Sequence, residues 1–323
     1  MDLKDARFRA HPTLLPDELL SSWLVRVARK HQTRTTSFTN MHFPEYNKNI
    51  IWQRDLDLWA PDTLLERLSF KSGLDEAILY GSTLRSYQGK LNASMAGKGH
   101  TPLIRSLGNY CHIKRLGGLR FCPECLASGP EPYYRKRWRL SFYTACPDHK
   151  TFLLDRCPEC SAPLTLSKIH EERDFGHCYK CGFDLRKAAA VAVLPDSWGI
   201  EAIRCLMEIL ERGSAYFDGR KIFSVDYFKG LRQIVKIIYL WGRSAGVLDH
   251  EAKHAKLPVY SGNPHLYETL APAEDLYYAY SAAVNILASR QSVDSFLREN
   301  RISASEANKD GHSNIFWAEN MDI

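Results

Sequence analysis

The chain has 323 residues, of which 45% are hydrophobic and 25% charged, a globular composition that excludes a mainly disordered or collagen-like protein. The sequence has no apolar run of about 20 residues, the length that a bilayer crossing needs. Its first 13 residues carry five charges in place of an apolar signal core, so we expect a cytoplasmic protein without membrane contact. The net charge of +6 suits an anionic partner but does not demonstrate one.

Helical patterns dominate the amino-terminal part. Residues 14–31 place Leu20, Trp23 and Val27 on one stripe, with Arg26 on another face, which predicts an amphipathic core helix. A helix from about Pro61, the turn 72–75 and a further helix outline a helix-turn-helix. A plain helical hairpin without nucleic-acid contact explains this outline equally well. Residues 90–100 are typical of a linker, and we expect this helix-turn-helix-like module to span residues 1–105.

Cysteines crowd the middle of the chain. Seven of the nine lie between residues 122 and 181, and without an export signal this crowding favours metal over disulfides. They form four pairs in which two residues separate the ligands, the spacing that lets a tight turn direct both side chains to one tetrahedral zinc ion. The pairs are Cys122 with Cys125, Cys146 with His149, Cys157 with Cys160, and Cys178 with Cys181.

Eight ligands of this kind predict two structural Zn²⁺ sites in a tandem zinc-ribbon region over residues 106–190. The long gaps within each expected site favour sequential pairing of the four pairs, while an interleaved cross-brace is the alternative. Four protein ligands leave no open position for substrate, so the metals predict no catalysis. Gly182 follows the last ligand, where a residue that tolerates positive φ completes a zinc knuckle. Seven thiolates and two divalent ions lower the net charge to about +3.

The carboxyl-terminal third reads as entirely helical. Apolar periodicity predicts helices from about Pro195, over 225–241, over 273–288 and over 293–300. We therefore expect a helical domain over residues 191–323. The expected fold class is mainly α, with small zinc-ribbon β elements, an amino-terminal helix-turn-helix-like module and a carboxyl-terminal helical bundle.

Basic residues gather around the first expected ribbon, where aromatic residues are interleaved with them. Such a segment can hold phosphates and stack on bases. A solvated strand with Trp138 turned inward onto the ribbon is the competing interpretation. The candidate nucleic-acid contacts are Lys114, Arg115, Arg135, Lys136 and Arg137.

Residues 250–254 match the zinc-peptidase pattern H-E-x-x-H, in which His250, Glu251 and His254 are the three specified residues. Pro258 follows shortly after, and no apolar active-site helix surrounds the match. A solvated helix end or loop is the favoured interpretation, and the zinc peptidase is a remote alternative. Phosphate-binding loops, nucleophile elbows and acidic metal clusters are not evident in the sequence, so we expect a protein that is not an enzyme.

Several ordered motifs together resemble the TniQ/TnsD family of transposon target-selection proteins. They are the segment Pro16 to Arg26, the segment Arg120 to Cys125, the stretch Tyr133 to Trp138, the pair Cys146 and His149, and the ribbon from Cys157 to Cys181. The resemblance covers about residues 10–190, and it is similar both to the TniQ proteins of CRISPR-associated transposons and to the amino-terminal part of a TnsD.

This resemblance implies a non-catalytic adaptor in the bacterial cytosol or nucleoid. Such a protein links target DNA or an RNA-guided CRISPR effector complex to the transposon's AAA+ ATPase regulator, and its amino-terminal region is expected to meet the ATPase. An autonomous zinc-ribbon protein that binds a specific attachment site or acts as a regulator is the alternative. A homo-oligomer is compatible with the sequence.

Overall fold

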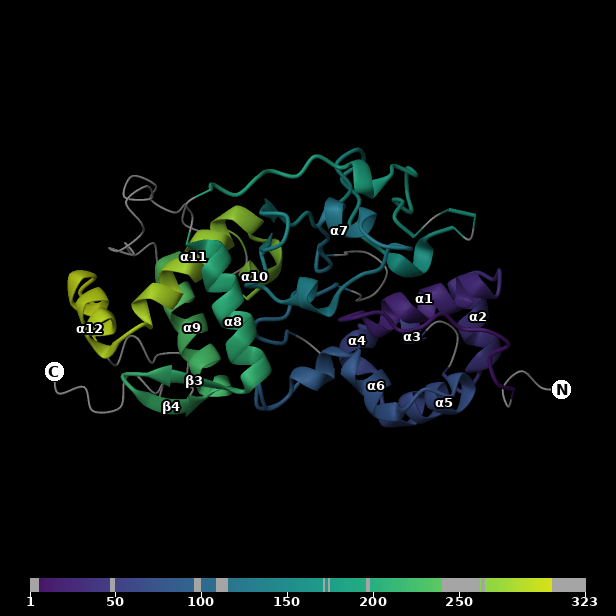
Figure 1. The fold of residues 1–323 in the computed structure, drawn as a ribbon, viewed down its shortest axis with the longest axis horizontal. Coiled ribbons are helices and arrows are strands. Elements are labelled where there is room, and N and C mark those ends of the chain that lie inside the picture. The colour runs from purple at the N-terminus through teal and green to yellow at the C-terminus, as the bar shows by residue number, and fades with distance from the viewer. Residues whose placement is uncertain are drawn as a thin grey trace. The chain divides into compact units, whose positions relative to one another are not determined.

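The computed structural model describes residues 6–46, 50–95, 100–108, 116–170, 172–173, 175–195, 198–239, 262 and 265–303. Helices predominate in these residues, and two small antiparallel sheets accompany them, which confirms the expected fold class (Figure 1). Contacts divide the chain into two compact units. The first comprises Met1–Ser86, Met95–Leu140 and Leu153–Val191, and the second comprises Tyr87–Ser94, Ser141–Phe152 and Ala192–Ile323. The expected division at residues 105 and 190 stays a prediction.

The first unit begins with a group of helices around one apolar core. Trp23, Leu24 and Val27 of the first helix are fully buried there, together with Phe38 and Leu64. These helices are α1 (Leu20–Lys30), α2 (Thr35–His42), α3 (Ile50–Gln53), α4 (Leu56–Trp59), α5 (Asp62–Ser72) and α6 (Glu76–Gly81). The short turns of helix η1 (Leu84–Tyr87), η2 (Lys136–Arg139), η3 (Leu166–Lys168) and η4 (Leu185–Lys187) and helix α7 (Pro123–Ala127) follow along the chain.

Helix α1 differs from its prediction in two respects. It begins at Leu20, because Asp17 has a φ of 57° and Leu19 is extended, and neither conformation continues a helix. It is also buried around its whole circumference from Leu20 to Ala28, so Arg26, on another face than the apolar stripe, is buried as well. Helical periodicity identifies the apolar stripe of the helix. It does not reveal that a charged residue on another face is buried by pairing with a buried residue.

The helix-turn-helix outline is present in the structure. Gly73 has a φ of 74° and ends α5, a left-handed conformation that glycine adopts without steric cost. The Asp75 carboxylate then accepts a hydrogen bond of 2.7 Å from the Ala77 N–H and caps α6.

The second unit contains a helical bundle built from α8 (Gly199–Arg212), α9 (Ser224–Tyr239) and α11 (Ala273–Ile286), with α10 (Tyr267–Leu270) and α12 (Arg290–Glu299) beside it (Figure 1). A side chain at Gly199 would collide with the Tyr277 ring, so glycine permits the close contact of α8 with α11. Phe142 stacks on Phe228, and the Ser141 hydroxyl lies 2.6 Å from the Tyr280 hydroxyl. These contacts join residues 141–152 to the bundle.

The expectation that the carboxyl-terminal third is entirely helical was wrong. Strands β3 (Ser214–Phe217) and β4 (Arg220–Phe223) form an antiparallel hairpin between α8 and α9. Its two turn residues, Asp218 and Gly219, have φ values of 50° and 73°, as a two-residue turn of type I′ requires. The other sheet pairs β1 (Ala145–Cys146) with β2 (Thr151–Phe152).

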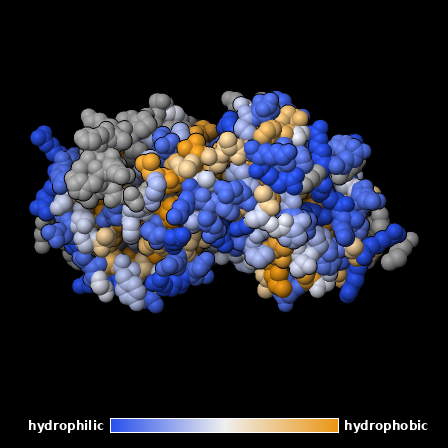
Figure 2. Space-filling model, turned by 45° about the horizontal axis from the view of Figure 1, so that its top comes forward, coloured by the Kyte–Doolittle hydropathy of each residue, from blue (hydrophilic) through white to orange (hydrophobic). Residues whose placement is uncertain are grey.

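The surface is largely hydrophilic on the face that Figure 2 shows, and hydrophobic side chains form separate groups on it. Within the described residues, no helix has both the length and the apolar content that a membrane crossing demands.

Candidate metal centres

The second expected metal site is assembled in the first unit from two Cys-x-x-Cys turns. Its four sulfur atoms lie within 4.8 Å of one another. The Cys157 and Cys181 sulfurs are 3.6 Å apart, and those of Cys160 and Cys178 are 3.7 Å apart. Sulfurs at the corners of a zinc tetrahedron with Zn–S of about 2.3 Å are separated by about 3.8 Å, and disulfide sulfurs by about 2.05 Å. The spacing therefore fits ligands around one ion.

Both turns of this cluster repeat one backbone geometry. The N–H of Ser161 donates to the Cys157 carbonyl at 2.9 Å, and the N–H of Gly182 donates to the Cys178 carbonyl at 3.0 Å. Ser161 has a φ of 55° and Gly182 a φ of 80°, so each residue after the second ligand is left-handed, as the sequence predicts for Gly182. The knuckle turns the chain back and leaves both sulfurs on its inner side.

Backbone amides in these turns favour the thiolate form, which is the form that binds metal. The Ala162 N–H is the main cause that lowers the pKa of the Cys160 thiol to about 7. A hydrogen bond from the Lys180 N–H reaches the Cys178 sulfur at 3.4 Å. Burial raises the pKa of the Cys157 thiol to about 12, so the N–H donors favour the thiolate at Cys160 and not across the whole set.

The first expected site draws its ligands from different local structures. Cys122 and Cys125 lie at the start of α7, whereas Cys146 ends β1 and His149 lies in the turn that follows. Cys122 and Cys125 belong to the first unit, and Cys146 and His149 belong to the second, where the Cys146 sulfur is 3.4 Å from His149 Nδ1. That the four residues share one ion stays a prediction. Lys150, the residue after His149, has a φ of 52°, and its N–H donates to the Cys146 carbonyl at 2.8 Å.

The cluster within the first unit groups the third and fourth pairs, which follow one another in the sequence, as the sequential arrangement requires and the interleaved one does not. Three thiolates with an imidazole, and four thiolates, are donor sets that suit tetrahedral zinc. All four donors of each set come from the protein, so an ion held there has a structural role and leaves no open position for substrate. The described cysteines include no disulfide.

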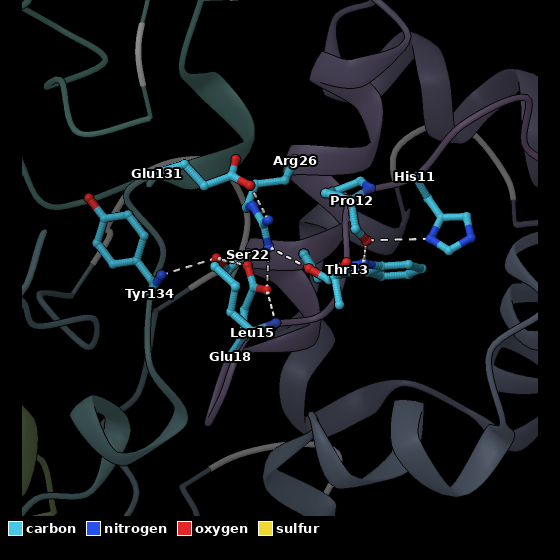
Figure 3. A network of polar contacts seen from close by, with 10 residues as sticks. His11, Pro12, Thr13, Leu15, Glu18, Ser22, Arg26, Glu131 and Tyr134 are labelled. Atoms are coloured by element: carbon cyan, nitrogen blue, oxygen red, sulfur yellow. Dashed lines mark hydrogen bonds and ion pairs between the residues drawn. The ribbon is translucent and has the colours of Figure 1, made fainter. Parts of the chain in front are cut away.

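A buried ion-pair network joins α1 to the segment before the basic residues (Figure 3). The Arg26 guanidinium donates to Glu18 Oε2 at 2.5 Å, and it also pairs with Glu131. The Ser22 hydroxyl donates to Glu18 at 2.8 Å and accepts from the Tyr134 N–H at 3.0 Å. Burial raises the pKa of Glu18, while the Arg26 charge opposes that rise. The network holds residues 131–134 against the first helix.

The basic segment is engaged mostly in contacts within the first unit. The Lys136 ammonium donates to the Gly81 carbonyl at 2.6 Å, and Arg137 pairs with Asp17 at 2.6 Å. The Arg135 guanidinium lies over the rings of Tyr133 and Trp138, at 5.2 and 5.6 Å from their centroids.

Trp138 is 1% exposed, as the inward-turned interpretation of this segment requires. The nucleic-acid contacts of Arg135, Lys136 and Arg137 stay a prediction. Lys114 and Arg115 lie outside the described residues, as do His250, Glu251 and His254 of the peptidase pattern.

Arg139, which follows this segment, is a buried charge that the sequence analysis did not single out. Its side chain is inaccessible to solvent, and it donates to Asp55 at 3.1 Å and lies 3.6 Å from Asp57. Asp57 also accepts hydrogen bonds from the Ser21 N–H and hydroxyl, both at 2.8 Å. Burial, with the charge of Asp55, raises the pKa of Asp57 to about 6. No local pattern marks these partners, because they are far apart in the chain.

The helix-turn-helix outline presents an acidic second helix. Asp75 and Glu76 are exposed at the start of α6, and Ile78 follows with 49% of its surface exposed. A recognition helix places its amino-terminal residues in the major groove, where carboxylates are repelled by the phosphates. This surface therefore favours the plain helical hairpin over a DNA-reading helix.

The comparison with known families agrees with this part of the chain. The family model described as TniQ matches residues 9–153, which contain the Arg26 network, the basic segment and all ligands of the first expected metal site. The chain carries a TniQ domain. This match confirms the TniQ resemblance, whereas the choice between the CRISPR-associated and TnsD types stays a prediction. A TniQ domain indicates a role in transposition, in target selection or DNA binding. No curated protein matches the chain.

Proposed function

We propose that this TniQ-domain protein is a non-catalytic adaptor that selects the target of a transposon. It links a target DNA site or an RNA-guided CRISPR effector complex to a AAA+ ATPase regulator. The observation that carries this proposal is the TniQ domain over residues 9–153. The amino-terminal helical group is the proposed contact for the ATPase.

The donor sets support a scaffolding mechanism. Cys122, Cys125, Cys146 and His149 would hold one structural Zn²⁺, and Cys157, Cys160, Cys178 and Cys181 would hold the other. Because a closed metal site forms only in the folded chain, metal affinity contributes to the free energy of folding. The metals would keep the ribbon turns rigid, and these turns would present the surfaces that meet the partners.

The charge distribution favours an adaptor over autonomous reading of a DNA duplex. The described candidates for phosphate contact include Lys136 and Arg137, which contact Gly81 and Asp17, and α6 begins with two carboxylates. An adaptor that leaves sequence recognition to a guide complex has no need of a basic recognition helix.

A pull-down tests this function. The zinc-loaded chain is immobilised and mixed with the purified ATPase regulator of the same transposon, with and without attachment-site DNA or the guide-loaded effector. Retention of the ATPase, increased by DNA or effector, is the expected result. Specific nanomolar binding of a duplex by the chain alone, with no retention of the ATPase, would support the autonomous DNA-binding protein instead.

Substitution of Arg135 alone tests the basic segment without disturbing the contacts of Lys136 and Arg137. The Arg135 guanidinium contacts two aromatic faces without an ion pair in the described part of the chain, whereas Lys136 and Arg137 support the fold. Arg135→Gln should weaken DNA retention by about threefold to tenfold and reduce its salt dependence by about one charge, with an unchanged melting temperature. Unaltered DNA retention would remove Arg135 from the interface.

A further inference from the structure

The hairpin of β3 and β4 exposes two aromatic rings in the second unit. Phe223 is 76% exposed, more than the other exposed large hydrophobic residues of the described chain, and Tyr216 is 61% exposed. Neither ring packs on another ring in the described structure. Exposed aromatic groups lose the free energy of burial, and their clustering marks a binding surface.

The strand register places these rings on one face. Tyr216 lies directly opposite Lys221, and Phe223 is two residues further along the same strand as Lys221. Side chains of directly paired residues, and of residues two apart, point to the same side of a hairpin. The diagonal pair Tyr216 and Phe223 is therefore separated by about 7–8 Å between Cα atoms.

The opposite face fixes the hairpin to the bundle. Ala215 and Phe217 are 2% and 6% exposed, and β3 contacts both α8 and α9 (Figure 1). The Arg290 N–H donates to the Asp218 carboxylate at 3.1 Å and holds the turn. The two outward rings consequently stand on a supported element and not on a free loop.

The charge on the outer face is positive. Lys221 is exposed on this face and makes no ion pair in the described part of the chain. The nearest acidic side chains in sequence are already engaged, because Asp218 accepts from Arg290 and Asp226 pairs with Lys229 at 3.3 Å. A cation beside two open rings complements a ligand that combines phosphates with flat apolar surfaces.

We propose that the outer face of the β3–β4 hairpin is a binding site for single-stranded nucleic acid. Tyr216 and Phe223 stack on two unpaired bases, while Lys221 contacts a phosphate between or beside them. Bases in a duplex are already stacked on each other and cannot offer their faces, so the site discriminates against double strands. The site is separate from the proposed ATPase adaptor role and does not depend on it.

Fluorescence anisotropy with labelled oligothymidylate and oligouridylate strands of about 15 nucleotides tests the site on the full zinc-loaded chain. Tyr216→Ala and Phe223→Ala should each weaken binding by about tenfold, and Phe223→Trp should retain it. Lys221→Gln should lower the slope of log affinity against log salt by about one. If the ring substitutions weaken binding of both strands equally, the site recognises the bases by stacking alone. A larger loss of affinity for one strand identifies the sugar that the site prefers.

Leu270→Ala is the matched control, since Leu270 is 42% exposed in the same unit and lies outside the hairpin. It should leave the affinity unchanged, and melting curves should show that all variants remain folded, because the substituted side chains are exposed. A duplex of the same length should bind more weakly and show no effect of the ring substitutions. Unaltered single-strand binding by a Tyr216→Ala, Phe223→Ala double variant would overturn the proposal and leave the surface to a protein partner.

Discussion

Substitution of Arg26 by methionine tests whether the buried ion-pair network stabilises the TniQ domain. The guanidinium is 3% exposed and Glu18 is fully buried, whereas the Glu131 carboxylate is 46% exposed. Arg26→Met preserves much of the side-chain volume but removes the cation from both carboxylates. Glu18 then keeps its contacts with the Leu15 N–H and the Ser22 hydroxyl and loses its charge partner.

The expected loss follows from the difference in burial between the two acids. Removing one partner of a buried ion pair costs about 3–5 kcal/mol, because the other charge stays desolvated. The half-exposed Glu131 adds less than about 1 kcal/mol, since water replaces its partner. Folded domains are stable by about 5–15 kcal/mol, so Arg26→Met should remove a large part of the stability of this unit.

Urea unfolding at pH 7, followed by tryptophan fluorescence, measures the loss, because Trp23 and Trp138 are buried in the same unit. Lys30→Met is the matched control, since Lys30 is an exposed cation at the end of α1 and should change stability by less than about 0.5 kcal/mol. The double variant Glu18→Gln, Arg26→Met should recover at least about 1.5 kcal/mol, because it also removes the unpaired charge.

The pH dependence provides a second readout with a defined sign. Burial already raises the pKa of Glu18 above 4.5, and loss of the Arg26 charge raises it further. The ionised form then costs stability at neutral pH, and this cost disappears below the unfolded pKa, where both states are protonated. The deficit of Arg26→Met should therefore shrink as the pH falls toward 4.5. A deficit as small as that of Lys30→Met, or one that persists at low pH, would refute the buried-charge account.

Three further predictions concern the metal clusters and the second charge network. Native mass spectrometry should find two zinc ions per chain, and Cys160→Ser should retain one; a chain that folds normally without metal would contradict the structural role. The pKa of Asp57 is raised to about 6, so the wild type should lose stability as the pH rises from about 4 to 6, and Asp57→Asn should not. Urea titrations that show the same pH dependence for both proteins would argue against the raised pKa. Gly182→Val should lower the free energy of unfolding by about 1–2 kcal/mol and speed the loss of zinc to a chelator, because Gly182 has a φ of 80° and a Cβ there would lie 2.9 Å from Arg173. Gly81→Ala is the control and should have neither effect, since a Cβ at Gly81 meets no neighbour. Equal chelation rates for the two variants would contradict the strained knuckle.

The sequence also contained a signal that the analysis overlooked. Asp218 and Gly219 form the dipeptide that type I′ hairpin turns prefer, and Ala215 and Phe217 alternate with the exposed Tyr216 before it. Strong helical periodicity on both sides hid this short element. The four-residue strands are too short to produce a clear alternating pattern by themselves.

Local spacing in the sequence was sufficient to predict the cysteine turns that could hold a metal and the helix-turn-helix outline, because each depends on residues within one turn. Two residues between ligands set the knuckle, and Gly73 supplies the left-handed conformation that ends α5. Only the tertiary structure could show that Arg139 is buried, since its partner Asp55 lies 84 residues away, and that Arg26 is buried with Glu18, since Glu131, 105 residues away, completes that network. A charged side chain is tolerated in a core only when the fold places an opposite charge beside it, and the local sequence pattern does not reveal that pairing.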